Sequence, residues 1–133
     1  MTAIRQAGAT SQIILIPGND WTGAATFVSD GSLAALQTVK SLDGTTTNLI
    51  FDIHKYCDSD GSGSHAECVT NNIDTAFAPL AASLRAIGRQ AMLTETGGGN
   101  TASCVTYVCQ ELAYVNANSD VYLGYTGVRT FRQ

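Results

Sequence analysis

Basic residues are scarce in this sequence, and they never gather into a cluster. Seven Lys and Arg residues lie scattered among 133 residues, against 11 Asp and Glu, so the net charge is −4. Nucleic acids and anionic membrane surfaces are bound through clustered positive charge. We therefore expect no nucleic-acid or membrane partner. A neutral polymer such as a polysaccharide fits a weakly charged surface, although such a surface does not require one.

Long apolar runs are also missing, because no stretch approaches the roughly 20 residues of a membrane-spanning helix. The first eight residues are too short and too polar for a secretory signal peptide. They predict the last turns of a helix that Gly8 ends, and so indicate further sequence upstream. The hydrophobic content of 44% excludes a disordered or coiled-coil chain and predicts one domain without an internal linker.

The four cysteines do not form a recognisable metal-binding pattern. No C-x-x-C pair occurs among Cys57, Cys68, Cys104 and Cys109, and only one histidine lies near them. The spacing of structural zinc sites is therefore absent, and we expect neither a metal nor a cofactor. Disulfide bonds in a secreted protein are the favoured interpretation, and buried free thiols are the alternative.

Apolar segments rich in β-branched residues alternate with segments of helical periodicity. The predicted strands are 12–16, 49–54, 90–95 and 121–125. The predicted helices are 32–39, 71–87, which Asn71 or Asn72 can cap at its start and Gly88 at its end, and 101–115. This alternation predicts consecutive βαβ units with a parallel sheet. A doubly wound sheet and a (β/α)8 barrel both satisfy it.

Glu95 ends the third predicted strand and directly precedes a loop with glycines at 97–99. Active sites of α/β proteins are built at the carboxyl ends of parallel strands, so this position predicts a catalytic carboxylate. A structural carboxylate that caps the next helix or pairs with an arginine is the alternative. The glycine loop lacks both the Lys-Ser/Thr pair and the G-x-G-x-x-G spacing of nucleotide sites. No second carboxylate in the sequence is a convincing partner for Glu95.

The segment 51–56 ends the second predicted strand with an imidazole and a phenol. Strand alternation puts Asp52, His54 and Tyr56 on one face and Ile53 and Lys55 on the other. His54 and Tyr56 can therefore hydrogen-bond a carboxylate or a substrate hydroxyl at the carboxyl edge of the sheet. A core histidine and a packing tyrosine are the alternative.

The acidic loop at 58–63 begins like a calcium-binding loop. Its twelfth position is Val69 instead of glutamate, and no pair of helices flanks it. We therefore predict a flexible polar loop in which His65 and Glu67 are solvated.

Trp21 follows the first predicted strand directly, after Asn19 and Asp20. A tryptophan in such a loop can stack on the apolar face of a sugar ring, or it can belong to the core. Tyr122 and Tyr125 on the last strand face opposite ways, so at most one of them can look into a site. No local pattern supports Ser-His-Asp or Cys-His catalysis.

Taken in order, these segments closely resemble the C-terminal half of fungal glycoside hydrolases of family 5, the cellulase family that includes secreted endo-β-1,4-glucanases. The resemblance runs from residue 3 to residue 127. The segments that carry it are Leu-Ile-Pro-Gly-Asn-Asp-Trp at 15–21, Asn-Leu-Ile-Phe-Asp-Ile-His-Lys-Tyr at 48–56, His-Ala-Glu-Cys at 65–68, Leu-Thr-Glu-Thr-Gly-Gly-Gly-Asn at 93–100 and Asn-Ser-Asp-Val-Tyr-Leu-Gly-Tyr at 118–125.

The resemblance implies part of a (β/α)8 TIM barrel, in which the four strands are the fifth to eighth. Glu95 matches the catalytic nucleophile at the end of the seventh strand, and His54 and Tyr56 match the sixth-strand pair that orients nucleophile and substrate. Trp21, with Asn19 and Asp20, would bind the sugar in the fifth loop. The expected substrate is a β-glucan, cellulose or a soluble β-1,4-glucan.

The resemblance also implies a cysteine arrangement and an extracellular location. Cys68 would pair with Cys104, Cys109 would bond a cysteine beyond this sequence, and Cys57 would stay unpaired. The whole chain, 1–133, would be a partial catalytic domain whose residues 128–133 diverge from the family or are truncated. Any signal peptide would lie outside this sequence.

The implied chemistry is retaining hydrolysis, in which a nucleophile and an acid/base carboxylate lie roughly 5–5.5 Å apart. The acid/base would lie upstream, in the missing N-terminal half of the barrel, so we expect the isolated chain to be inactive. Four strands alone would expose an inner face and two edges, which predicts a marginal, aggregation-prone or dimeric chain. A β-mannanase of the same family and a non-catalytic carbohydrate-binding remnant are the alternatives.

Overall fold

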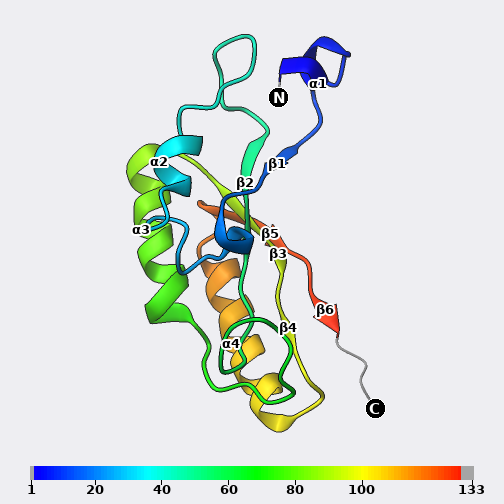
Figure 1. Ribbon diagram of the computed structural model, residues 1–133, viewed down its shortest axis with the longest axis vertical. Helices are drawn as coiled ribbons and strands as arrows, with labels where there is room; N and C mark the ends of the chain where they lie inside the picture. The colour runs from blue at the N-terminus through cyan, green and yellow to red at the C-terminus, as the bar shows by residue number, and fades with distance from the viewer. Residues whose placement is uncertain (1, 130–133) are drawn as a thin grey trace.

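The computed structural model describes residues 2–129, which form a four-stranded parallel sheet with helices packed on one face, and a small two-stranded sheet (Figure 1). The main sheet has four strands in the order β1-β2-β3-β5, and all three pairings are parallel. These strands are β1 (Ile14–Ile16), β2 (Leu49–His54), β3 (Ala91–Glu95) and β5 (Tyr122–Tyr125). The four predicted strands and their parallel arrangement are confirmed, although three of them are shorter than expected.

One helix precedes the first strand, and the other helices lie in the connections between strands of the main sheet. They are α1 (Thr2–Gln6), the short 3₁₀ turn η1 (Asp20–Thr22), α2 (Ser32–Leu36), the π-helical turn η2 (Ile73–Phe77) with α3 (Ala78–Ile87) directly after it, and α4 (Ala102–Ala117). The helix predicted at 32–39 is therefore only five residues long. Gly8, in a left-handed conformation, follows α1 as expected. Among residues 2–129 no helix has the length and apolar character needed to cross a membrane.

The helix predicted at 71–87 begins differently from the expectation. The side chain of Asn71 accepts a hydrogen bond from the Ile73 N–H at 3.1 Å, so Asn71 supplies the cap. Asn72 takes a left-handed conformation and makes no side-chain cap. At the other end, Gly88 adopts the left-handed conformation of a helix C-cap, as predicted.

A second, two-stranded sheet was not predicted. β4 (Gly97–Gly98), in the glycine loop, pairs in parallel with β6 (Val128–Arg129). Two-residue strands rich in glycine carry no alternating pattern, so sequence periodicity cannot reveal them. The backbone of the first two residues of the predicted divergent tail therefore belongs to the sheet, and residues 130–133 lie outside the described part of the chain.

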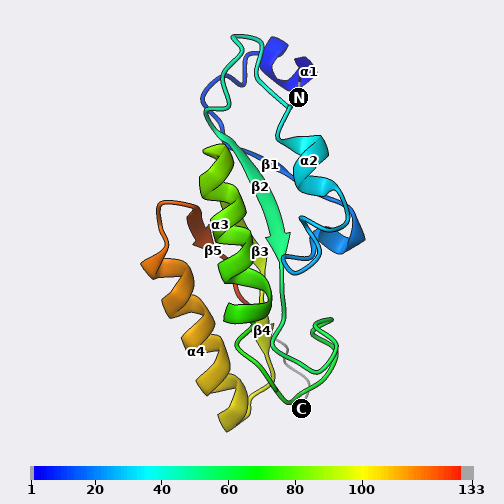
Figure 2. The same cartoon turned by 90° about the vertical axis from the view of Figure 1, so that its left-hand side faces the viewer.

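The hydrophobic core lies between the sheet and the helices on one of its faces (Figure 2). Phe51 and Ile53 of β2 and Leu93 of β3 are fully buried there, together with Leu80 and Leu84 of α3. The opposite face of the sheet is open among the described residues. On that face Leu15 is 37% exposed and Leu123 45% exposed.

Candidate active site

The carboxyl ends of β2 and β3 bring the three predicted catalytic residues together. A register shift after Ile53 places His54 opposite Glu95, where a regular ladder would have placed Thr94. The Tyr56 hydroxyl donates a hydrogen bond to Glu95 Oε2 at 3.4 Å, and His54 Nδ1 lies 3.7 Å from the same oxygen. The Glu95 side chain remains 47% exposed, so its carboxylate is held on one side and open to a ligand on the other.

His54 lies between two carboxylates. Its Nε2 is 3.6 Å from Asp52 Oδ2, on the side away from Glu95. Asp52 in turn accepts a hydrogen bond from the Thr94 hydroxyl of the neighbouring strand. This chain of contacts fixes the ring plane of His54 and aims its second nitrogen at Glu95. Strand alternation predicted that Asp52 shares a face with His54, but not this contact.

Tyr56 is suited to remain a hydrogen-bond donor. Burial raises the pKa of its phenol, and the charge of Glu95 and the hydrogen bond to it raise it further. The phenol therefore stays protonated at acidic and neutral pH. Gly63 lies against the ring, and a Cβ built there would come within 2.7 Å of a ring carbon. Only glycine at this position lets the following loop pack on Tyr56.

Trp21 stands at the edge of the same site and is 88% exposed. Three successive residues, none of them glycine, adopt left-handed backbone conformations. They are Asp20, Trp21 and Thr22, with φ of 50°, 51° and 62°. Such conformations are strained and persist only when surrounding contacts hold them. Here Thr22 Oγ1 accepts from the Gly18 N–H at 2.6 Å, and the Ala24 N–H donates to the His54 carbonyl at 2.9 Å. The strained turn directs the indole of Trp21 outward, beside the carboxyl ends of the strands.

A cleft of about 620 Å³ joins these features. Glu95, His54 and Tyr56 line it, together with Asp20 and Trp21. Asp60, Gly61 and Ser62 of the following loop also line the cleft, with Lys55, Gly23, Ala25 and Thr26. Asn19 is exposed and is not among the lining residues. The structure thus brings together five of the six residues predicted for catalysis and substrate binding.

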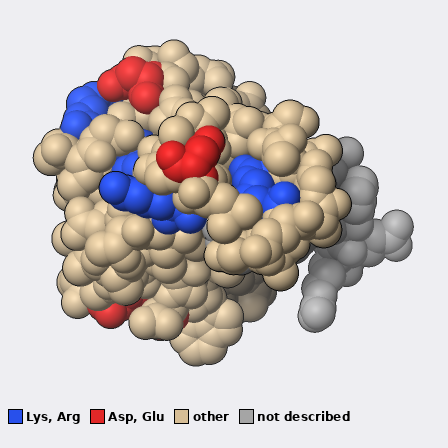
Figure 3. Space-filling model, turned by 90° about the horizontal axis from the view of Figure 1, so that it is seen from above, with Lys and Arg blue, Asp and Glu red and all other residues tan. Residues whose placement is uncertain are grey.

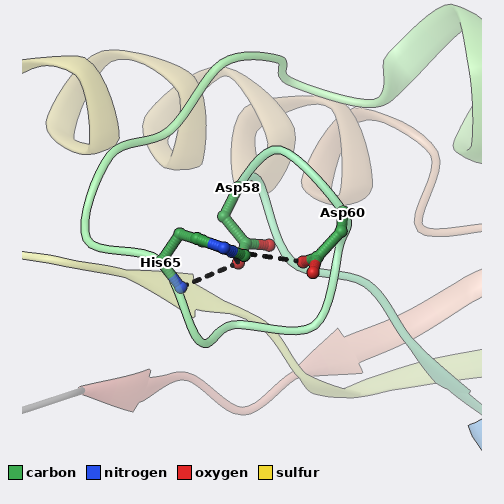
Figure 4. Close-up of side chains that lie close together, drawn as sticks. All are labelled: Asp58, Asp60 and His65. Carbon is green, nitrogen blue, oxygen red and sulfur yellow. Dashed lines mark hydrogen bonds and ion pairs between the residues drawn. The ribbon is translucent and has the colours of Figure 1, made fainter.

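The loop of residues 57–67 is polar, as predicted, and a buried carboxylate organises it (Figure 4). Asp58 is only 3% exposed and accepts hydrogen bonds from the Gly63 N–H, the His65 N–H and the His65 ring, each at 3.1 Å. Asp60 lies 3.4 Å from the same ring nitrogen. The sequence did not predict this organisation, because the i-to-i+5 and i-to-i+7 contacts of Asp58 have no local sequence signature. His65 is exposed, as predicted. Glu67 is exposed, as expected.

The charged side chains of this loop, Asp58, Asp60 and His65, interact with one another. Burial alone would raise the pKa of Asp58, but its hydrogen bonds from His65 and Gly63 outweigh burial and hold the pKa below its usual value. The hydrogen bond to Asp58 and the charge of Asp60 raise the pKa of His65. Ligand atoms of the three side chains lie within 4.8 Å of one another. Both Asp58 oxygens are already occupied by N–H donors, so a cation would have to displace those bonds.

A disulfide bond joins Cys68 to Cys104, which confirms the predicted pairing. It connects the end of the 57–67 loop to the start of α4. The glycine loop makes room for it, because a Cβ on Gly98 would lie 2.5 Å from the sulfur of Cys68. A Cβ on Gly99 would lie 2.3 Å from the Ala66 carbonyl oxygen. The glycines therefore allow the glycine loop to pack closely against the end of the 57–67 loop.

The other two cysteines are free thiols among the described residues. Cys57 is buried, as expected of an unpaired residue, and Cys109 is exposed on α4. Burial strongly raises the pKa of Cys57, and the neighbouring charge of Glu111 adds to the effect. Cys57 is therefore a neutral packing residue and a hydrogen-bond donor.

Sequence reasoning missed Glu111, which is fully buried beneath the site. It accepts hydrogen bonds from Thr96 Oγ1, Cys57 Sγ and Asn72 Nδ2. The sequence could have indicated its burial, because Glu111 lies on the apolar stripe of the predicted helix, three residues after Val108 and four before Val115. A carboxylate on such a stripe needs buried partners.

The parallel α/β arrangement, with its cleft at the carboxyl ends of the strands, is that of a partial barrel, and comparisons with known proteins identify its family. Residues 1–128 match the family described as Cellulase (glycosyl hydrolase family 5), and the chain belongs to this family. It is 67% identical over 127 residues to endoglucanase EG-II of Hypocrea jecorina, covering 96% of this chain and 30% of that protein. It is 43% identical over 127 residues to the manganese dependent endoglucanase Eg5A of Phanerodontia chrysosporium, covering 95% of this chain and 32% of that protein.

Solved structures of the same family superpose closely on the chain. Cel5A (EG2) from Hypocrea jecorina gives a TM-score of 0.94 at 66% identity, covering 96% of this chain and 39% of that one. XacCel5A in complex with cellopentaose gives 0.83 at 29% identity, covering 98% and 43%. The chain thus spans about a third of its curated relatives' length. Its four strands are part of a (β/α)8 barrel, and the doubly wound alternative is excluded.

Proposed function

We propose that these residues form the C-terminal half of the catalytic domain of a secreted endo-β-1,4-glucanase, with their strands as the fifth to eighth of the barrel. The observation that carries the proposal is the placement of Glu95. Its half-exposed carboxylate faces a cleft, contacts Tyr56 and His54, and has an outward-turned tryptophan nearby. The endoglucanase names of its relatives support the same substrate class, a β-1,4-linked glucan.

In this mechanism the ionised Glu95 attacks the anomeric carbon and forms a glycosyl ester as the bond to the leaving oxygen breaks. The Tyr56 hydroxyl stabilises the charged carboxylate and directs it toward the cleft. His54, oriented by Asp52, supports the same oxygen of Glu95 from the sheet side. Trp21 offers an apolar ring face for a sugar next to the reacting one.

The second carboxylate is proposed to come from sequence outside these 133 residues. It gives a proton to the leaving oxygen and then takes one from the water that hydrolyses the ester, which requires it to lie roughly 5–5.5 Å from Glu95. The sheet face left open by residues 2–129, and the edges of β1 and β5 that no strand in this range pairs, are where the remaining half of the barrel would pack. Residues 1–133 would then be a partial catalytic domain, with 128–133 diverging from the family pattern.

The surface agrees with an uncharged polymer as ligand and with an extracellular setting. The chain carries a net charge of only −4, and on the face seen in Figure 3, at the end of the molecule that carries α1 and away from the cleft, acidic and basic residues cover a minor part of the surface. A disulfide bond such as Cys68–Cys104 persists in oxidising compartments outside the cell. A β-glucan bound in the cleft needs polar and aromatic contacts and no charge complementarity.

A chimera tests the proposal. This chain replaces the segment that it matches in endoglucanase EG-II of Hypocrea jecorina, and the product is assayed on soluble β-1,4-glucan and on β-mannan. We expect glucan hydrolysis, and we expect Glu95→Gln to abolish turnover while oligosaccharide binding persists. Glu67→Gln, the same change at an exposed glutamate that bonds Ser103, serves as the matched control and should keep full activity.

Trapping the ester gives a direct readout. A 2-deoxy-2-fluoro cellobioside with a good leaving group should add its sugar mass to the tryptic peptide that begins after Arg89. The adduct should be absent in Glu95→Gln. Full turnover by Glu95→Gln would refute the nucleophile assignment. Preferential cleavage of mannan would favour the β-mannanase alternative, and binding without any hydrolysis would favour a non-catalytic remnant.

A further inference from the structure

A fully buried carboxylate lies directly under the site, on a helix that does not reach the cleft. Glu111 of α4 has no exposed surface and is not among the residues that line the cleft. Its Oε1 accepts from Thr96 Oγ1 at 2.5 Å, and its Oε2 accepts from Asn72 Nδ2 at 3.3 Å and Cys57 Sγ at 3.2 Å. Every donor comes from a different segment, so the contacts are tertiary.

These donors are next to the residues of the site. Thr96 directly follows Glu95, and Cys57 directly follows Tyr56. Asn72 also donates to the Tyr56 carbonyl oxygen at 3.0 Å through the same amide nitrogen. One carboxylate thus connects the chain after β3 with the chain after β2, at the two points where Glu95 and Tyr56 emerge.

A glutamate at this fully buried position is energetically unfavourable unless its carboxylate is well hydrogen-bonded. Burying a carboxylate carries a large desolvation cost before its partners compensate, and apolar side chains of similar volume often stabilise a core as well or better. Burial also raises the pKa of Glu111, while its hydrogen bonds and the charge of Lys55 act against that rise. What a buried carboxylate adds over an apolar residue is direction, because its two oxygens accept donors only at defined angles.

We propose that Glu111 is a positioning residue, which holds the backbone after Tyr56 at a set distance from the backbone after Glu95 and thereby sets the contact between the Tyr56 phenol and the Glu95 carboxylate. The inference rests on the proposed role of Glu95 as nucleophile. Glu111 itself does not touch substrate, since it is enclosed below the strand ends.

Three variants test the proposal. Glu111→Leu removes both acceptor oxygens, so Thr96 Oγ1 and Cys57 Sγ lose this acceptor, and Asn72 keeps only its bonds to the 56–57 segment. Glu111→Gln keeps the shape and one acceptor oxygen, so it is the conservative rescue. Val115→Ala, one turn further along α4 and also buried, leaves a cavity without touching the network and controls for lost stability.

The first readout is the titration of the Tyr56 phenol, followed by the ¹³Cζ signal of labelled tyrosine in the chimera and in this chain, with Tyr56→Phe to assign the signal. Burial contributes most to the raised pKa of Tyr56, and contact with Glu95 adds to it, so we expect that pKa to fall partway toward its ordinary value in Glu111→Leu. It should stay unchanged in Glu111→Gln and Val115→Ala. This readout needs no turnover, so it stands even if the chimera proves inactive.

The second readout is turnover of β-1,4-glucan by the chimera. We expect Glu111→Leu to lower kcat by roughly tenfold or more with KM nearly unchanged, because small displacements of reacting groups cost rate more than binding. Glu111→Gln should restore kcat, and Val115→Ala should lower the melting temperature but not kcat.

Two outcomes would overturn the proposal. Either Glu111→Leu leaves the Tyr56 titration and kcat at wild-type values, or Val115→Ala moves both as far as Glu111→Leu does. If Glu111→Leu does not fold, Thr96→Val takes its place, because it removes one donor at nearly constant volume. A wild-type Tyr56 titration in a folded Thr96→Val would then count against the proposal.

Discussion

The hydroxyl of Tyr56 lies 3.4 Å from Oε2 of Glu95, across two neighbouring strand ends that are 39 residues apart in the chain. The contact depends on the irregular register between β2 and β3, on the loop glycine that packs against the Tyr56 ring, and on the buried network below. The phenol thus faces the carboxylate by tertiary packing, and it is available to support a negative charge there.

Removing the Tyr56 hydroxyl should slow the chemical step. A hydrogen bond to a charged group contributes about 1.5–3 kcal/mol, which corresponds to a fall in kcat of roughly 10- to 100-fold for Tyr56→Phe. KM should change little, because the lost bond supports the nucleophile and not the bound sugar. Steady-state kinetics of the chimera measures both. Tyr107→Phe on α4 is the control, and an unchanged kcat in Tyr56→Phe would contradict the assigned role.

Trp21→Ala should weaken substrate binding without destabilising the fold. A lost aromatic contact with a sugar costs about 1 kcal/mol, which corresponds to a rise in KM of roughly fivefold. The indole is already 88% exposed, so the melting temperature should not move. Kinetics on cello-oligosaccharides and a thermal melt measure the two effects. A lower melting temperature with an unchanged KM would show that Trp21 is a packing residue.

The pairing of Asp58 with His65 should make the stability of the 57–67 loop depend on pH in both directions. The pKa of Asp58 is lowered in the folded chain, so its contribution is present above the unfolded pKa and is lost as the pH falls through the lowered value. The pKa of His65 is raised, so its contribution is full below the unfolded pKa of 6.5 and is lost as the pH rises through the folded value. The loop is therefore most stable at mildly acidic pH.

Proteolysis of the loop as a function of pH measures this dependence. Asp58→Asn should flatten the acidic side of the profile, and His65→Asn should flatten the alkaline side. The two variants control for each other, because each should leave one limb of the wild-type curve partly in place. A wild-type profile that does not change between pH 3 and pH 8 would contradict the ion pair as the stabilising contact.

The isolated chain of 133 residues should be marginally stable. Its sheet exposes Leu15 and Leu123 on the open face, and β1 and β5 are edge strands. Such surfaces favour aggregation or association of copies. Gel filtration with light scattering and differential scanning calorimetry should show oligomers or a broad, weakly cooperative transition. A monomer that melts in one sharp transition would contradict this expectation, and the chimera, with its barrel closed, is the control.

The sequence by itself determined the four strands of the main sheet, the two long helices α3 and α4, and the strand ends at which the candidate catalytic residues lie. Apolar runs of β-branched residues located the four strands, and apolar positions at helical spacing located α3 and α4, because these periods are local properties of the chain. Glu95 and His54 end their strands, so their place at the carboxyl edge of a parallel sheet follows from the order of elements alone. The family motifs added the pairing of Cys68 with Cys104.

Tertiary structure alone decided how these groups meet. The register shift that sets His54 opposite Glu95, the strained turn that presents Trp21 and the use of Asn72 as an inward donor instead of a helix cap each depend on contacts between distant segments. The burial of Asp58 and Glu111 likewise depends on contacts with residues beyond their immediate neighbours in the sequence. A polar side chain is drawn inside only where donors from other parts of the chain offset its desolvation, and no local pattern of residues records where those donors will be.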